Sequence, residues 1–241
     1  MKIEIVSHRG ANGLAPENTM AAAQASLDLG VDYIEVDVWT SRDHVFYIMH
    51  DPTVDRTTDG SGHLLSLDST VIDQLDAGSW FDPRFAGERV PRLEDFLDWA
   101  RGRTKVFFDV KFAHPHHLIE LIRAKGMVDD CFLWSGSRGW MWLCHEMAPE
   151  LALKVNVLTV ADVAKAHEDL GARIVEVGPH NLTHDLIAAC RSRGIRIMAY
   201  PEQNTEAVFR DLLARDIDMI NLDQPDLFVQ VRDGRPMRDD E

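Results

Sequence analysis

Eight short runs rich in β-branched and aromatic residues alternate with eight amphipathic stretches along this sequence. The alternation predicts an α/β protein with the TIM (β/α)8 barrel fold. The chain has 241 residues, 45% of them hydrophobic, so a single barrel of this class can bury a large core. The same alternation also permits an open, doubly wound parallel sheet, which is the alternative fold.

The predicted strands cover residues 3–7, 33–38, 105–111, 131–135, 152–157, 173–177, 195–200 and 218–222. The predicted helices lie near residues 19–29, 92–101, 115–125, 137–147, 160–170, 182–193 and 204–215, and a last short helix begins near Pro225. Local signals support the first helix, because Asn18 or Thr19 can cap its start and Gly30 lies just past its end.

One long segment, residues 39–91, separates the second strand from its helix and carries turn signals such as Asp51-Pro52 and Asp59-Gly60. We expect a β-hairpin arm followed by a small insertion of about residues 51–91, with one short helix near 69–77. A loop this long is usually functional. Because no linker interrupts the sequence, we expect one domain over residues 1–241, ending in a polar tail from Arg232.

Composition narrows the classes of partner. The formal net charge of -15 disfavours nucleic acids and anionic membrane surfaces, and no apolar run reaches the ~20 residues that a membrane span needs. Cys131, Cys144 and Cys190 are odd in number and have no metal-binding spacing, which favours buried thiols in a reducing compartment. The expected location is therefore cytoplasmic. The oligomeric state stays open, and a homo-oligomer is compatible with the sequence.

Ionisable side chains gather where the first two strands end. His8 and Arg9 follow the first strand, where an imidazole can move a proton and a guanidinium can bind a phosphate. Glu35 and Asp37 are two residues apart on the second strand, so they share a face about 6.6 Å apart. Two carboxylates inside a barrel call for a cation, and oxygen ligands favour Mg²⁺ or Ca²⁺ over Zn²⁺. A half-exposed strand or a layer of salt bridges is the structural alternative.

The hairpin arm brings a second histidine into the prediction. If Ser41–His44 form a four-residue loop and Thr40 pairs with Val45, Glu35 lies opposite His50. Opposed residues share a face, so this register would place the imidazole beside the predicted cation. The alternative is a histidine that caps the turn at Asp51-Pro52.

The third strand supplies Asp109 and Lys111, which again share a face. Asp109 could be a third carboxylate ligand, and the ammonium of Lys111 could bind a phosphate oxygen. A local ion pair between them is the structural alternative. Seven such side chains fall at the same end of the first three strands or on the attached arm, which favours a catalytic site.

Several longer motifs of the sequence resemble those of a known enzyme family. The chain resembles the glycerophosphodiester phosphodiesterase family through His8-Arg9-Gly10, Ala15-Pro16-Glu17-Asn18-Thr19, Ile34-Glu35-Val36-Asp37-Val38 and the run from His50 to Gly60, with weaker matches as far as Asp226. The resemblance implies a TIM barrel with a small insertion after strand two. It implies a metal-dependent enzyme that splits small glycerophosphodiesters into glycerol 3-phosphate and an alcohol.

The resemblance also assigns roles by position. It makes His8 and His50 the acid–base pair and Arg9 and Lys111 the phosphate-binding residues. The metal ligands would be Glu35, Asp37 and Asp109, and the cofactor would be one divalent cation, Mg²⁺ or Ca²⁺. Glu17 and Asn18 would support the site.

Three places depart from the family pattern, and one of them is Trp134-Ser135-Gly136, which replaces a common Ser-Phe after strand four. Asp109 stands where the family often has Glu, and Asp here is also seen in related sphingomyelinase D-like phospholipases. Tyr200 stands where a Trp-Thr-Val-Asn run is common, and we expect it to form an aromatic wall of the substrate site. Two other functions remain: a phospholipase D-like lyase that acts on lysophospholipids and releases a cyclic phosphate, and a non-catalytic barrel that binds a phosphate sugar. The nucleophile, water or the glycerol 2-hydroxyl, stays open.

Overall fold

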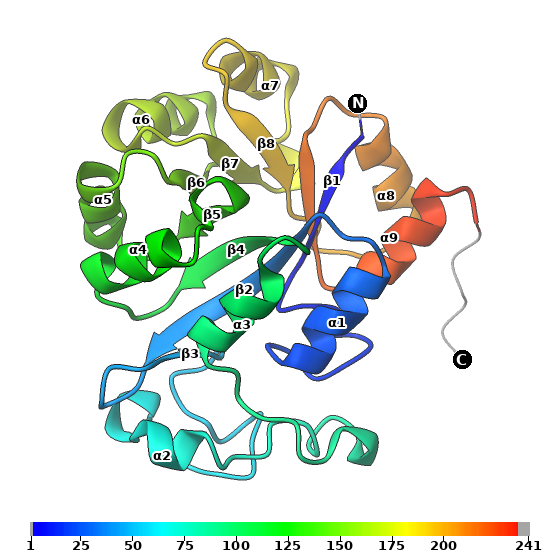
Figure 1. The fold of residues 1–241 in the computed structure, drawn as a ribbon. Helices are drawn as coiled ribbons and strands as arrows, with labels where there is room; N and C mark the ends of the chain where they lie inside the picture. The colour runs from blue at the N-terminus through cyan, green and yellow to red at the C-terminus, as the bar shows by residue number, and fades with distance from the viewer. Residues whose placement is uncertain (1, 236–241) are drawn as a thin grey trace.

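The computed structural model describes residues 2–235, in which eight parallel strands close into a barrel (Figure 1). The order is β1-β9-β8-β7-β6-β5-β4-β2, and β1 pairs with β2 to close the ring, with β3 antiparallel on β2. The strands are β1 Glu4–Ser7, β2 Tyr33–Thr40, β3 Phe46–Ile48, β4 Lys105–Val110, β5 Cys131–Trp134, β6 Ala152–Asn156, β7 Ile174–Val177, β8 Arg196–Ala199 and β9 Met219–Leu222. The predicted TIM barrel is confirmed, and the pairing of β1 with β2 excludes an open sheet.

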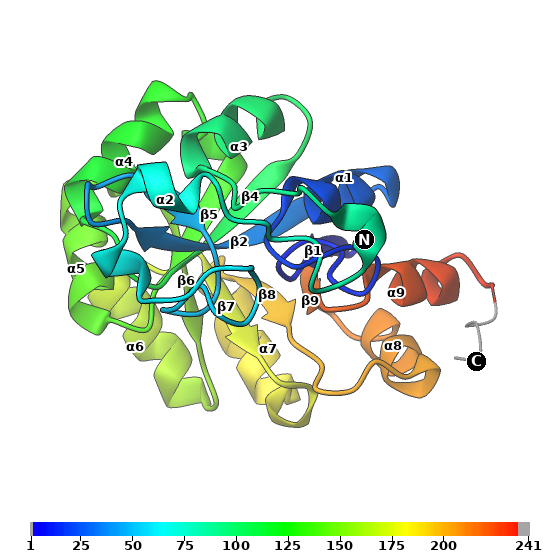
Figure 2. The same cartoon turned by 90° about the horizontal axis from the view of Figure 1, so that it is seen from below.

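Helices surround the barrel on the outside, and Figure 2 shows them as a ring around the strands. They are α1 Met20–Asp28, α3 Leu93–Ala100, α4 Pro115–Ala124, α5 Arg138–Met147, α6 Val160–Leu170, α7 His184–Arg191, α8 Glu206–Leu213 and α9 Pro225–Arg232. Each lies within three residues of its predicted limits. None of the described helices is long and apolar enough to cross a membrane. The last six residues of the predicted tail, 236–241, lie outside the described residues.

The insertion after β3 contains the short helix α2 Ser69–Ile72 and the 3₁₀ turns Leu64–Ser66 and Pro83–Phe85. It has its own apolar cluster, in which Tyr47, Val54 and Leu64 are fully buried. An isolated antiparallel bridge between Tyr47 and Arg92 connects the residue before α3 to the hairpin arm. The insertion is therefore packed structure that crosses one end of the barrel (Figure 2).

The predicted register of the hairpin arm is wrong by one residue. Thr40 pairs with Phe46, and the N–H of Ser41 donates to the carbonyl of Val45, so the loop has three residues instead of four. His44 ends that loop in the left-handed conformation with φ 68°, as three-residue hairpin loops require. Because β3 ends at Ile48, no ladder pair places His50 opposite Glu35.

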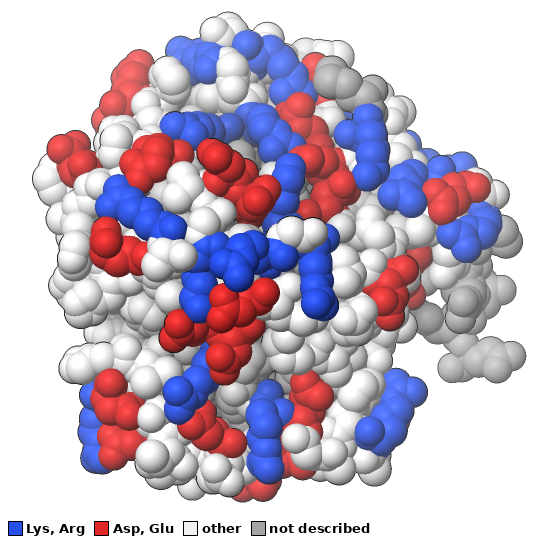
Figure 3. Space-filling model, in the orientation of Figure 1, with Lys and Arg blue, Asp and Glu red and all other residues white. Residues whose placement is uncertain are grey.

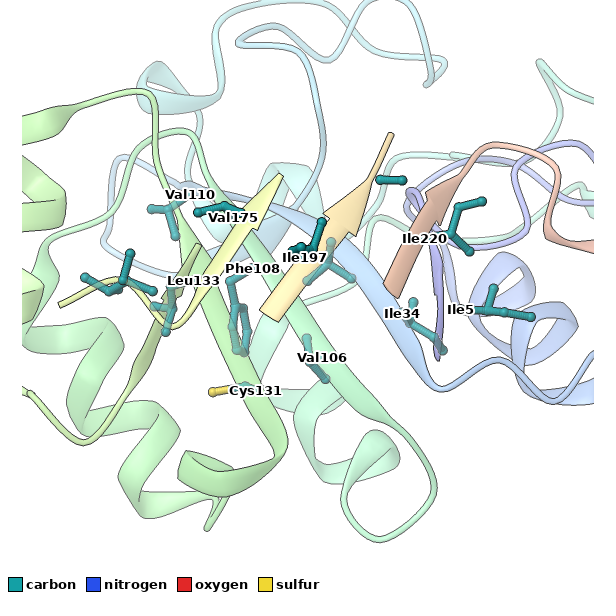
Figure 4. Close-up of a cluster of buried hydrophobic side chains, with 14 of the residues drawn as sticks. Ile5, Ile34, Val106, Phe108, Val110, Cys131, Leu133, Val175, Ile197 and Ile220 are labelled. Atoms are coloured by element: carbon teal, nitrogen blue, oxygen red, sulfur yellow. The ribbon is translucent and has the colours of Figure 1, made fainter. Parts of the chain in front are cut away.

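Strand side chains alternate between two cores. Those that point outward pack against the helices, among them Ile5, Ile34 and Val106 (Figure 4). The inward side chains begin with an apolar layer: Val6, Tyr33, Phe107, Phe132, Ile174, Met198 and Met219. Two residues further along their strands, the same faces carry His8, Glu35 and Asp109. The barrel interior is thus apolar at one end and ionisable at the carboxyl end.

On the face of the molecule in Figure 3, acidic and basic side chains are interspersed, with no large area of a single sign. Ion pairs also occur across the described structure, such as those of Arg191 with Asp216 and Asp218. The three cysteines are free and buried in the described structure, in agreement with the expectation of buried thiols.

Gly10 permits the close approach of α1 to the end of β1. Its φ is 76°, and a Cβ atom there would lie 2.7 Å from Ala22 Cβ and 2.9 Å from the Ala22 carbonyl carbon. We expect Gly10→Ala to lower the free energy of unfolding by about 2–5 kcal/mol, from the left-handed backbone and overpacking together. Guanidinium unfolding measures this value.

Gly30→Ala is the matched control, because Gly30 has φ 71° but its added Cβ meets no described atom within 4 Å. Gly30→Ala should lower the free energy of unfolding by about 1 kcal/mol, the cost of a left-handed backbone conformation alone. Equal losses in the two variants would contradict a steric role for Gly10.

Candidate active site

The end of β1 turns sharply, and the turn fixes His8 and Arg9. Arg9 has φ 57°, an uncommon conformation for a residue with a side chain that is often found at functional sites. Its backbone N–H donates to Glu35 Oε2 at 2.5 Å, and its carbonyl accepts from the N–H of Asn18 at 2.9 Å. The turn after β1 is therefore bonded directly to an acidic side chain of β2.

The three predicted metal ligands converge inside the barrel. Asp37 on β2 and Asp109 on β4 are partners in the parallel ladder, and Glu35 lies two residues before Asp37. One ligand oxygen from each of the three lies within 4.8 Å of the others, a spacing at which they could hold a metal ion. Glu35 Oε1 and Asp109 Oδ1 are buried and accept no hydrogen bond from any described residue. Burial and the neighbouring Asp37 raise the pKa of both Glu35 and Asp109. Unsatisfied oxygens and mutual repulsion are what a divalent cation would relieve.

Two cationic side chains border the acidic group. Lys111 Nζ lies 3.0 Å from Asp37 Oδ1 and 2.8 Å from Asp109 Oδ2. The guanidinium of Arg9 is held between Asp37, with Nε at 3.5 Å from Oδ2, and Glu17, with Nη1 at 3.1 Å from Oε1. Both cations remain partly exposed, so the site offers positive charge to an anion from solvent.

Asn18 and Glu17 hold these groups in place. Asn18 adopts φ 58°, and its Nδ2 donates to Asp37 Oδ2 at 2.7 Å while its Oδ1 accepts from the Asp37 backbone at 3.3 Å. Glu17 accepts hydrogen bonds from Arg9 and Arg56, which lower its pKa despite its partial burial. The structure thus brings both residues into direct contact with Arg9 or Asp37.

His8 is oriented by the residue that follows the last strand, Asp223. Its Nδ1 lies 2.7 Å from Asp223 Oδ1, and Asn12 Nδ2 donates to the same oxygen. Burial disfavours the imidazolium, but the hydrogen bond to Asp223 and the charge of Glu35 outweigh it and raise the pKa of His8 to about 9. Tyr200 contacts His8 edge-to-face, with 5.8 Å between ring centroids, so it lies beside the proposed site.

His50 reaches the same end of the barrel by a route other than the predicted one. The N–H of Met49 still donates to the Asp37 carbonyl at 3.0 Å, which keeps the chain beside β2 after β3 has ended. His50 then lines a small cavity of about 10 Å³ together with Glu17 and Asn18. Its Nδ1 lies 2.7 Å from Asp51 Oδ1.

Sequence reasoning missed two residues that complete these contacts. Asp223 follows β9 and shares its inward face with Asn221, so the end of the last strand was the available signal. Arg56 bridges Asp51 and Glu17 and thereby connects the His50 segment to Arg9. It lies in the insertion, where no periodic pattern marks it.

The arrangement brings together two oriented imidazoles, three carboxylates of which two are buried, and two cations at the carboxyl end of one barrel. The profile of the glycerophosphoryl diester phosphodiesterase family matches residues 8–227, nearly the whole described chain. The chain belongs to this family. The family resemblance found in the sequence is confirmed, and the chain is an enzyme of the glycerophosphodiester phosphodiesterase class.

Relatives and solved structures agree with this assignment. The glycerophosphodiester phosphodiesterase of Caldanaerobacter subterraneus is 29% identical over 97% of this chain and 100% of its own length. The crystal structure of glycerophosphodiester phosphodiesterase from Agrobacterium tumefaciens is 43% identical, with a TM-score of 0.88 over 95% of this chain and 99% of that one. An Oleispira antarctica phosphodiesterase, solved with its product sn-glycerol-3-phosphate, is 23% identical with a TM-score of 0.86, and shares the fold.

Proposed function

We propose that this protein is a divalent-cation-dependent phosphodiesterase that hydrolyses glycerophosphodiesters to glycerol 3-phosphate and an alcohol. The observation that carries the proposal is the convergence of Glu35, Asp37 and Asp109 beside the bound guanidinium of Arg9 and the ammonium of Lys111. Family membership supplies the substrate class. Bound there, Mg²⁺ or Ca²⁺ would polarise the phosphoryl oxygens and neutralise charge.

The residues of this chain would each contribute a separate part. Arg9 and Lys111 would bind the phosphate and stabilise the negative charge that develops on its oxygens. Asn18 would keep Asp37 oriented, and Glu17 would keep the guanidinium of Arg9 in place. Tyr200 would form a wall beside His8.

The two histidines would move the protons. His8 would accept the proton of the nucleophile once a cation on Glu35 offsets the carboxylate charge that raises the pKa of the imidazole. Asp223 would fix the ring and stabilise the charged form that results. His50 would donate a proton to the leaving alkoxide, held in orientation by Asp51. The seven charged and imidazole side chains of the predicted site are all present at this end of the barrel, which favours catalysis over a non-catalytic binding barrel.

A panel assay tests the proposal. Protein stripped with EDTA and dialysed is incubated with glycerophosphocholine, glycerophosphoethanolamine, glycerophosphoinositol and glycerophosphoglycerol, and Mg²⁺, Ca²⁺ or Mn²⁺ is added in turn. We expect release of glycerol 3-phosphate only after a cation is added, with a rate about 10²-fold or more above the stripped protein. Coupled detection of glycerol 3-phosphate gives the rate, and ³¹P NMR identifies the phosphorus products.

Three outcomes would contradict the proposal. Full activity of the stripped protein would exclude a required cation. A cyclic phosphate as the final product would replace the hydrolase by the lyase alternative. No product from any member of the panel would remove the proposed substrate class. Glycerol 3-phosphate itself, a monoester, serves as the control that should not be cleaved.

A further inference from the structure

A partly exposed aromatic pair, half-buried Trp39 and exposed Phe112, borders the proposed active site and takes no part in the chemistry described above. Trp39 is the next inward residue after Asp37 on β2, about 6.6 Å further along the strand. Phe112 directly follows Lys111. The two rings are stacked, with centroids 6.3 Å apart and planes 18° apart.

Backbone contacts fix this pair against the catalytic elements. The N–H groups of Lys111 and Phe112 both donate to the carbonyl of Val38, and Thr40 Oγ1 donates to the carbonyl of Phe112. Trp39 Nε1 donates to the carbonyl of His50 at 3.0 Å. The aromatic pair therefore lies between the residue proposed to bind phosphate and the residue proposed to protonate the leaving group.

The two rings are held in a fixed position, and part of their surface is exposed to solvent. His63 packs edge-on against Trp39, with ring centroids 5.8 Å apart and planes at 85°, and so restricts its rotation. Phe112 stacks on Trp39 and yet is 52% exposed, an unusual exposure for a large apolar side chain held by so many contacts. Ring surface is thus presented to solvent in a fixed place.

We infer that Trp39 and Phe112 form the subsite for the alcohol portion of the substrate and select alcohols that carry a quaternary ammonium, such as choline. This inference rests on the proposed function. The face of an aromatic ring attracts a weakly hydrated cation, and a desolvated contact with such a ring favours a cation over a neutral group. The net charge of -15 also favours cations near this surface. Lys111 would not oppose this in the bound complex, because its charge is proposed to pair with the phosphate of the same substrate.

The test separates charge from size. It compares kcat/KM for glycerophosphocholine with kcat/KM for its neutral analogue, in which carbon replaces the choline nitrogen. Wild-type protein should prefer the choline ester by about tenfold. In Phe112→Leu, which keeps an apolar side chain without the ring, the preference should fall to about twofold or less, and Phe112→Tyr should retain it.

Trp142→Leu is the matched control, since Trp142 is 51% exposed on α5 and lies outside this pair. It should leave every ratio unchanged. A preference that survives Phe112→Leu, or equal use of both esters by wild-type protein, would overturn the inference. Calorimetric binding of the two esters to the cation-loaded protein repeats the comparison without turnover. An absence of hydrolysis on every ester with preferential binding of the choline ester intact would count against the proposed function and leave the subsite standing.

Discussion

Replacing Asp37 by asparagine is expected to lower kcat/KM by about 10³-fold or more, the equivalent of several kcal/mol of lost transition-state stabilisation. Asp37 contacts more of the site than any other carboxylate described here. Its two oxygens face Asn18, Arg9 and Lys111, and Asp109 is its ladder partner. An amide of the same shape removes the charge, so the site should lose its affinity for a divalent cation.

Steady-state kinetics and calorimetric titration with Mn²⁺ measure the two effects. Wild-type protein should bind one equivalent of cation and gain thermal stability from it, whereas Asp37→Asn should do neither at the same concentrations. Asp218→Asn is the control, because Asp218 precedes β9 at the opposite end of the barrel, where it pairs with Arg191. If Asp37→Asn keeps its activity within about tenfold of wild type, the proposed role of the carboxylates is wrong.

The second large effect concerns the two histidines. His8→Gln and His50→Gln should each lower kcat by about 10²–10⁴-fold, the usual contribution of general acid–base catalysis. Cation binding should persist, because neither imidazole belongs to the acidic group. The double variant should lose less than the product of the single losses, since residues that act together are not additive.

A substrate with an easily lost alcohol distinguishes the two roles. A p-nitrophenyl ester of glycerol phosphate needs little protonation of its leaving group. The deficit of His50→Gln should therefore shrink on this ester, while that of His8→Gln should remain. A smaller deficit of His8→Gln on this ester, with that of His50→Gln unchanged, would make His8 the acid and His50 the base. Full activity of either variant would exclude that histidine from catalysis. His167→Gln, on the exposed surface of α6, is the control.

Strand periodicity accounts for how much of the site the sequence could predict. Alternation on two strands was enough to place Glu35, Asp37 and Asp109 together, because parallel neighbours in a barrel end at the same rim. The boundaries of the helices followed from capping residues and glycines. These signals are local or repeat along the chain, so a single sequence contains them.

The contacts that the sequence could not predict depend on the closure of the barrel and on the backbone conformation of single loop residues. The partner of His8 is Asp223, 215 residues away, and only closure of β9 on β1 brings them together. The hairpin register failed because His44 adopts a left-handed conformation that nothing in its residue type demands. Arg56 reaches Asp51 and Glu17 from an irregular loop with a long side chain, where no periodicity applies.

The most direct test of the central claim is an anomalous difference map from crystals of this protein soaked in Mn²⁺. The account predicts one strong peak bound by carboxylate oxygens of Glu35, Asp37 and Asp109, at about 2.2 Å as is usual for such a cation. A crystal with no peak there, or with its strongest peak on other ligands, would contradict the account.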